Sequence, residues 1–158
     1  TAVAAAPVPN QKALARYIAT RYDKPLAYAG DIVRTTFEEA RKYALPPTLL
    51  LGMMEKESGF NAAATSSYGA QGLMQVVPRF HMDRLKNHET ESSFKNPRTN
   101  IRVGAHILAE YVATHRSLDK ALSKYSGSSR GYSRQVRSNW QKFEKMGHSN
   151  TPARTSRR

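Results

Sequence analysis

The chain lacks cysteine altogether, which excludes a disulfide framework and a cysteine-bound metal site. It has no run of roughly 18 apolar residues, the length that a transmembrane helix needs. Its five histidines are scattered without an HExxH pattern, and neither a Gly-Lys-Ser/Thr phosphate loop nor a GxSxG nucleophile elbow occurs. A metal or nucleotide enzyme is therefore not expected, and the sequence predicts neither a bound metal nor a cofactor.

Acidic residues are scarce: 12 Asp and Glu stand against 25 Lys and Arg, for a formal net charge of +13. Between residues 129 and 158, eight cations accompany a single acid, Glu144. Such a charge favours polyanionic partners, namely nucleic acid, acidic lipid or an anionic cell wall, and a role in solubility is an equal alternative. No DNA-binding motif is present, so a nucleic-acid partner is not expected.

Length and composition suit one domain, because 158 residues with 39% apolar side chains are enough for a single core. We predict a monomeric folded domain over 11–146. The segments 1–10 and 147–158 are predicted to be disordered, since neither has a periodic apolar pattern. The Ala- and Pro-rich beginning fits either the start of a mature secreted chain or a shortened one, and the removal of a signal peptide or lipid anchor stays open.

Apolar residues recur at helical spacing with almost no strand-like alternation, which predicts an all-α fold. Residues 60–77 are rich in glycine and small polar residues. They are predicted to be mainly loop, with a small hairpin near 62–77 as the alternative. Helices are predicted at 11–22, from a cap at Asp31 to about residue 44, at 47–58, at 79–86, from Asn96-Pro97 onward, at 118–124 and from Tyr132 to Phe143.

The third predicted helix carries a carboxyl at an unusual place. Leu50, Met53 and Met54 share one face, and Glu57 continues that apolar stripe at the next turn. Glu55 stands about 200° around the helix from it and is predicted to point to solvent. Partial burial and the negative helix end would both raise the pKa of Glu57, as a general acid requires. The alternative is a Glu at a frayed helix end that reaches water.

Two further groups of residues suit sugar binding. The segment 66–75 combines two closely spaced glycines with hydroxyl and amide side chains, although such composition is common in loops. Tyr125, Tyr132 and Trp140, with Tyr111 nearby in the sequence, offer aromatic faces on which sugar rings stack. Aromatic residues at helical spacing are also typical of a core, so both interpretations stand for this cluster.

Together these segments resemble the catalytic domain of the soluble lytic transglycosylases, glycoside hydrolase family 23. The resemblance covers about residues 31–143, and its motifs occur in the family's order and at fitting separations. The matching segments are Glu57-Ser58-Gly59-Phe60-Asn61 for ESxFN, Gly72-Leu73-Met74-Gln75 with Pro78 for GLMQ and the xxP that follows, Asn100-Ile101-Arg102-Val103-Gly104-Ala105 for NIxxGxxYL, and Tyr125-Ser126-Gly127 with Tyr132 to Val136 for AYNxG and YxxxV.

The resemblance implies a lysozyme-like, mainly α-helical fold with one catalytic residue, Glu57. Substrate-binding roles are implied for the matching positions Ser66, Met74, Gln75, Tyr125 and Tyr132. Of these, Met74 is expected to shape the groove, Tyr125 to orient Glu57 or the substrate, and Tyr132 to be a groove wall or a core residue. The sequence departs from the family at Ser126, where Asn is usual, and at His106, near a position that is often Tyr.

The activity that the resemblance implies is cleavage of peptidoglycan glycan strands. Glu57 would protonate the glycosidic oxygen between N-acetylmuramic acid and N-acetylglucosamine, and the substrate's N-acetyl group would stabilise the cationic centre. Glu57 would then deprotonate the C6 hydroxyl, which closes a 1,6-anhydro ring. A single carboxyl fits the sequence, because no other acid after Glu57 occurs in a motif.

Three alternatives remain at this point: a goose-type lysozyme that uses water, a non-catalytic wall-binding module, and a basic nucleic-acid binder. The implied location is periplasmic or secreted, with a phage particle as another setting. The implied partners are peptidoglycan strands, with secretion or cell-envelope machinery as a further partner class.

Overall fold

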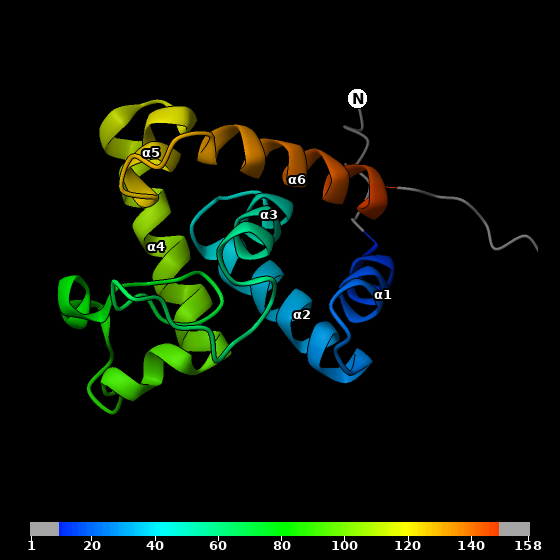
Figure 1. Cartoon of the computed structure of the whole chain (residues 1–158), viewed down its shortest axis with the longest axis horizontal. Coiled ribbons are helices and arrows are strands. Elements are labelled where there is room, and N and C mark those ends of the chain that lie inside the picture. Colours follow the sequence, from blue (N-terminus) through cyan, green and yellow to red (C-terminus); the bar gives the residue numbers. More distant parts are fainter. Residues whose placement is uncertain (1–9, 149–158) are drawn as a thin grey trace, which may run out of the picture.

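Helix α3 (Pro47–Ser58) lies at the centre of the structure, a computed structural model that describes residues 10–148 (Figure 1). Around it are arranged the other α-helices of the described part, α1 (Gln11–Arg21), α2 (Leu26–Lys42), α4 (Pro97–His115), α5 (Leu118–Tyr125) and α6 (Tyr132–Gly147). Between α3 and α4 the chain is irregular, with short 3-10 helices η1 (Pro78–Phe80), η2 (Met82–Arg84) and η3 (Glu91–Lys95). The all-α prediction is confirmed.

The irregular segment contains no strand within the described residues. Its nearest approach to a sheet is a pair of isolated antiparallel bridges, Thr65 with Gln71 and Gln71 with Val76. The prediction of loop rather than regular structure at 60–77 therefore holds, and the small hairpin is reduced to these two bridges.

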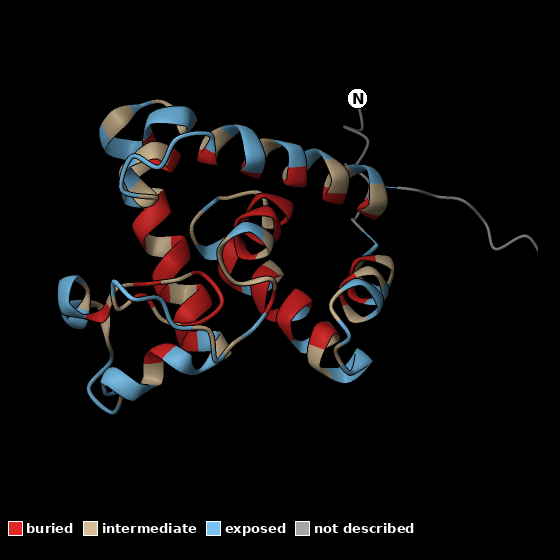
Figure 2. Cartoon of the chain, in the orientation of Figure 1, coloured by how far each residue is buried: buried red, intermediate tan, exposed pale blue. Residues whose placement is uncertain are grey.

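Local signals set both ends of α3. Pro47 occupies the first turn, where its missing N–H costs nothing, and Gly59 ends the helix in the left-handed conformation, with φ 57°. Every residue from 48 to 54 is buried, so this part of the helix is covered on all sides, whereas its last turn has intermediate and exposed residues (Figure 2). α3 packs against α2 and α6. The predicted helix bounds are confirmed, but its buried surface is far wider than one stripe.

α6 runs antiparallel to α3 and approaches it closely. A Cβ atom at Gly52 would lie 3.0 Å from the Trp140 backbone nitrogen, so only glycine permits this approach. The Asn139 side-chain amide donates to the Gly52 carbonyl at 3.1 Å. The predicted inner face of α6 is confirmed, because its four members are all buried: Tyr132, Val136, Asn139 and Phe143.

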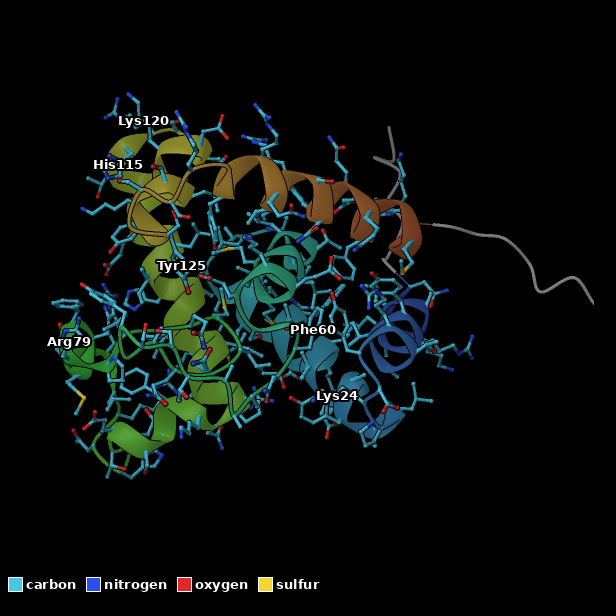
Figure 3. The ribbon with its side chains drawn as sticks, viewed as in Figure 1. Lys24, Phe60, Arg79, His115, Lys120 and Tyr125 are labelled. Atoms are coloured by element: carbon cyan, nitrogen blue, oxygen red, sulfur yellow. The ribbon has the colours of Figure 1, made fainter. Side chains whose placement is uncertain are left out.

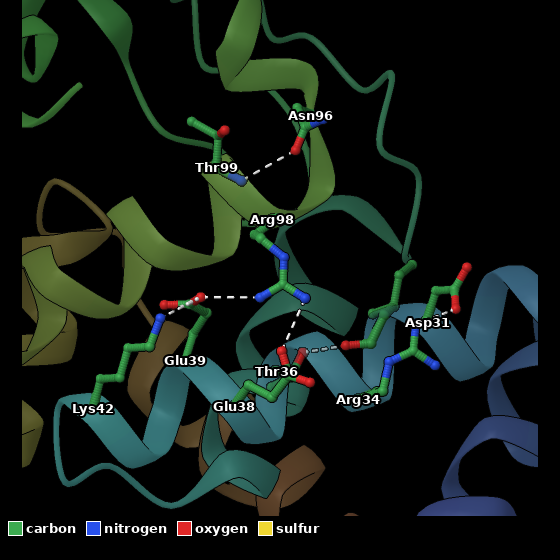
Figure 4. Close-up of polar contacts among 10 residues, drawn as sticks. Asp31, Arg34, Thr36, Glu38, Glu39, Lys42, Asn96, Arg98 and Thr99 are labelled. Atoms are coloured by element: carbon green, nitrogen blue, oxygen red, sulfur yellow. Dashed lines mark hydrogen bonds and ion pairs between the residues drawn. The ribbon is translucent and has the colours of Figure 1, made fainter. Parts of the chain in front are cut away.

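A cluster of charged groups joins α2 to the beginning of α4 (Figure 4). Arg98 is 2.9 Å from a Glu38 carboxylate oxygen and 3.3 Å from one of Glu39. Glu39 is only 1% exposed and also accepts from Lys42 at 3.1 Å. Because a buried carboxylate needs cationic partners, these contacts hold the two helices in register.

Two element predictions were wrong. α2 begins at Leu26, directly after Pro25, so Asp31 lies inside the helix and pairs with Arg34 at 2.6 Å instead of capping it. The helix expected at 79–86 is replaced by η1 and η2. Arg84, in η2, bonds to Glu110 of α4 at 2.6 Å and to His81 at 3.1 Å.

The N-terminal cap of α1 contacts the end of α6. Asn10 caps α1 by accepting from the Ala13 N–H, and its own N–H donates to the Gly147 carbonyl at the end of α6. Residues 1–9 and 149–158, where most of the predicted disorder falls, lie outside the described residues. In the described part of the chain, no helix is both long and apolar enough to cross a membrane.

Candidate active site

A cleft of about 410 Å³ opens beside the C-terminal end of α3. Its walls come from the last turn of α3, the segment 66–81, the middle of α4, the end of α5 and the turn that leads into α6. Tyr125 and the segment that carries Arg79 lie on the same side of α3, opposite α1 (Figure 3). The cleft thus gathers residues that are far apart in the sequence, including most of the predicted site.

Glu57 lines this cleft from the last turn of α3. Burial is the largest influence on its carboxyl and raises its pKa from 4.5 to about 7. A hydrogen bond from Tyr132 and the charge of Lys56 oppose that rise, because both favour the carboxylate. Glu57 therefore exchanges a proton near neutral pH, which suits a group that first donates and then accepts one.

Tyr132 and Tyr125 hold the site in different ways. The Tyr132 hydroxyl donates to Glu57 Oε2 at 3.3 Å, although Tyr132 was expected only as a groove wall or core residue. The Tyr125 hydroxyl donates to the Met74 carbonyl at 2.7 Å and so ties the end of α5 to the segment below it. Both rings line the cleft. The orienting contact to Glu57 thus comes from Tyr132, whereas Tyr125 positions the opposite wall.

Gln75 and Ser66 line the cleft, and Met74 does not. The Gln75 side-chain amide donates to the carbonyls of Ala64 and Gly72, at 3.1 and 2.9 Å. Ser66 is exposed, and its hydroxyl accepts from the Ala70 N–H at 3.0 Å.

Met74 is fully buried against Gly104 of α4. Its side chain packs against α4, and its carbonyl accepts from the cleft residue Tyr125. The expected shaping of the groove is therefore indirect.

Asn100, which the sequence analysis left without a role, fastens the segment 71–75 to α4. Its side chain accepts from the Met74 N–H at 2.7 Å and donates to the carbonyls of Gln71 and Phe94. It is completely buried. The signal was present in the sequence, because Asn100 opens the motif that resembles NIxxGxxYL.

Glu57 is the only acidic residue among the described residues that line the cleft. Several acids that follow Glu57 in the sequence have cationic partners outside the cleft. Glu89 pairs with Arg102 at 2.5 Å, which lowers its pKa to about 2, and Glu110 pairs with Arg84. No group of three or more His, Asp or Glu residues in the described part is placed to hold a metal ion.

Comparison with known protein families identifies the family of this chain. The sequence matches the Transglycosylase SLT domain over residues 34–146. The chain belongs to this family. It is 41% identical over 76 residues to membrane-bound lytic murein transglycosylase C of Actinobacillus pleuropneumoniae serotype 5b, a match that covers 44% of this chain and 21% of that protein. It is 34% identical over 86 residues to the transglycosylase of Enterobacteria phage PRD1, covering 54% and 31%.

The fold also resembles that of a solved relative, an inactive mutant of the lytic transglycosylase Slt from Pseudomonas aeruginosa. The TM-score is 0.55 at 21% identity, and the match covers 73% of this chain and 22% of that one. This likeness confirms the predicted lysozyme-like fold. The SLT domain described here matches less than a third of the length of each of these relatives.

Glu55 of this SLT domain does not point to solvent, contrary to the prediction. Its carboxylate is 9% exposed and pairs with Lys142 of α6. It also accepts from the hydroxyls of Tyr17 and Tyr22, at 3.2 and 2.7 Å. α1 and α6 cover the face of α3 that was expected to be free, so Glu55 is a structural ion-pair partner.

The predicted aromatic cluster divides between cleft and core. Trp140 does not line the cleft; its indole N–H donates to Thr48 at 3.1 Å, near the other end of α3. Tyr111 does line it, and the Lys124 ammonium lies 4.9 Å from the centre of its ring.

The two departures from the family pattern also differ in position. Ser126 lines the cleft, while its hydroxyl donates to the Ser123 carbonyl within the turn. His106 lies outside the cleft lining, stacks on Tyr43 and pairs with Glu110.

Proposed function

We propose that this SLT domain is a lytic transglycosylase that cleaves peptidoglycan strands between N-acetylmuramic acid and N-acetylglucosamine. The observation that carries the proposal is a single cleft carboxyl, Glu57, whose pKa of about 7 allows it to donate and accept a proton. The match to the family, and relatives that bear the name lytic murein transglycosylase, support this activity.

The first step is protonation of the glycosidic oxygen by Glu57. The bond from C1 of N-acetylmuramic acid to that oxygen breaks, and its electron pair leaves with the N-acetylglucosamine hydroxyl. The positive charge that develops at C1 is stabilised by the substrate's own N-acetyl carbonyl. A second protein carboxylate is not needed for this step, which agrees with the lining of the cleft.

The second step uses the same residue as a base. Glu57, now a carboxylate, takes the proton of the C6 hydroxyl while that oxygen attacks C1 and closes the 1,6-anhydro ring. Glu57 is protonated again, and no water is consumed. The Tyr132 hydroxyl donates to Glu57 Oε2 and so stabilises the carboxylate between the two steps.

This activity places the substrate in a bacterial cell envelope, reached either from the periplasm or from outside, as by a phage. The positive charge of the chain suits an anionic wall, because opposite charges raise the rate of encounter.

The direct test compares Glu57→Gln with Glu91→Gln on purified peptidoglycan. Glu91 is an exposed carboxyl of η3 outside the cleft, so its replacement makes the same Glu-to-Gln change and leaves the site intact. Glu57→Gln should lose nearly all lytic activity, and Glu91→Gln should retain it. Normal activity in Glu57→Gln, or equal loss in both variants, contradicts the assignment.

A further inference from the structure

Exposed aromatic side chains gather at the mouth of the cleft. Tyr68 is 63% exposed and Phe80 is 58% exposed, yet both rings line the same cleft as Glu57. Few large apolar side chains in the described part of the chain are exposed to solvent, and Tyr68 and Phe80 are the two aromatic residues among them. Exposed apolar side chains that gather in one patch at a groove point to a binding site, whereas singly scattered ones do not.

Arg79 holds the two rings in place. Its guanidinium carbon lies 4.4 Å from the centre of the Tyr68 ring and 4.7 Å from that of Phe80. Its Nη1 also donates to the Tyr68 carbonyl at 2.8 Å. Cation–π contacts and this hydrogen bond together fix an aromatic, cation, aromatic arrangement that free side chains would not keep.

Gly69 makes room for this arrangement. Its φ of +97° is in the region that favours glycine, and a Cβ there would lie 3.1 Å from Arg79 Nη1. A side chain at this position would therefore press on the guanidinium. The backbone turn, the arginine and the two rings fit one another, which distinguishes them from a chance surface cluster.

We propose that Tyr68, Arg79 and Phe80 form a distal saccharide subsite, which stacks a pyranose ring of the same glycan strand that Glu57 cleaves. The apolar C–H face of a pyranose carries partial positive charge and is attracted to the negative face of an aromatic ring. Arg79 does not itself line the cleft, so its role is to position the two rings. Continuity with the catalytic cleft favours a glycan over a membrane or protein partner. This inference rests on the proposed function.

The test measures binding, separately from catalysis, in the Glu57→Gln background with chitohexaose as the probe. Tyr68→Ala and Phe80→Ala should each weaken binding about tenfold by calorimetry. Tyr68→Phe should bind normally, because stacking needs the ring and not the hydroxyl. Met82→Ala is the matched control, since Met82 is 45% exposed on the adjacent η2 but does not line the cleft.

The possible outcomes test the proposed subsite separately from the proposed activity. If chitohexaose binds the Glu57→Gln protein and both alanine variants bind it equally well, the subsite is wrong and the proposed function stands. If Met82→Ala weakens binding as much as the others, the patch acts as a general apolar surface and the subsite is again wrong. If chitohexaose does not bind the Glu57→Gln protein at all, the subsite is wrong, whereas the proposed function is decided separately by the activity of Glu57→Gln on peptidoglycan. Unchanged thermal unfolding of each variant verifies its fold.

Discussion

Replacing Glu57 by Gln should stabilise the domain above pH 7, even though it removes the proposed acid. The native carboxyl has a pKa of about 7, against 4.5 for an unperturbed Glu. At about 1.4 kcal/mol per pH unit, that difference corresponds to roughly 3 kcal/mol of native-state stability lost when Glu57 ionises. Gln has a similar shape and does not ionise, so it avoids this loss.

The direction of the Glu57 pKa shift determines the pH range in which Glu57→Gln stabilises the domain. Because the native pKa is raised, the folded protein holds the Glu57 proton more tightly than the unfolded chain does. Stability from this group is complete below about pH 4.5 and is lost as pH rises to about 7. The difference between Glu57→Gln and the unmodified protein should therefore be small at pH 4 and largest at about pH 8.

Thermal unfolding across this pH range measures the effect. For a domain of this size, roughly 3 kcal/mol corresponds to a Tm increase of about 6–12 °C for Glu57→Gln at about pH 8. Glu91→Gln, at an exposed carboxyl, should show no such pH-dependent gain. A constant difference between Glu57→Gln and the unmodified protein from pH 4 to 8, or lower stability of Glu57→Gln at pH 8, would refute the burial argument.

Three further substitutions probe the surroundings of Glu57. Tyr132→Phe removes a hydrogen bond that favours the carboxylate, so the midpoint of the alkaline fall in kcat/KM should rise from near 7 by about half a pH unit. Lys56→Gln should move the same midpoint upward by a smaller amount, because Lys56 contributes the weaker influence. Glu55→Gln should leave the midpoint in place but lower the free energy of unfolding by about 1–2 kcal/mol, through loss of the Lys142 pair. An unmoved midpoint in Tyr132→Phe, or a moved one in Glu55→Gln, would contradict these assignments.

Local sequence signals predicted α3 and its carboxyl well, but not its surroundings. Pro47 and Gly59 mark the helix ends through backbone chemistry that needs no tertiary contact. Glu57 lies in the cleft with a largely buried carboxyl, as the stripe argument predicted. Leu49 and Leu51, which lie off that stripe, are nevertheless as buried as the residues on it. Periodicity does not reveal how many neighbours cover a helix, and for this reason Glu55 was assigned to solvent.

The irregular part of the site was harder to predict because tertiary contacts hold it. Asn100 anchors the segment 71–75 from α4, and Arg84 is held by α4 in place of a helix at 79–86. The position of an aromatic residue along α6 determines whether it lies at the cleft or at the other end of α3. Since α6 runs antiparallel to α3, Tyr132 reaches Glu57 while Trp140 meets Thr48. The direction and pairing of helices are not encoded in any one segment.

The product of digestion tests the central claim most directly. The account predicts fragments that end in 1,6-anhydromuramic acid, lighter than the hydrolysis products by one water, because the C6 hydroxyl held in the cleft has a proximity advantage over free water. Purified peptidoglycan should be digested in oxygen-18 water and the separated muropeptides weighed by mass spectrometry. Anhydro ends without the heavy isotope are the predicted result. Reducing ends that carry oxygen-18 would contradict it and identify the domain as a hydrolase.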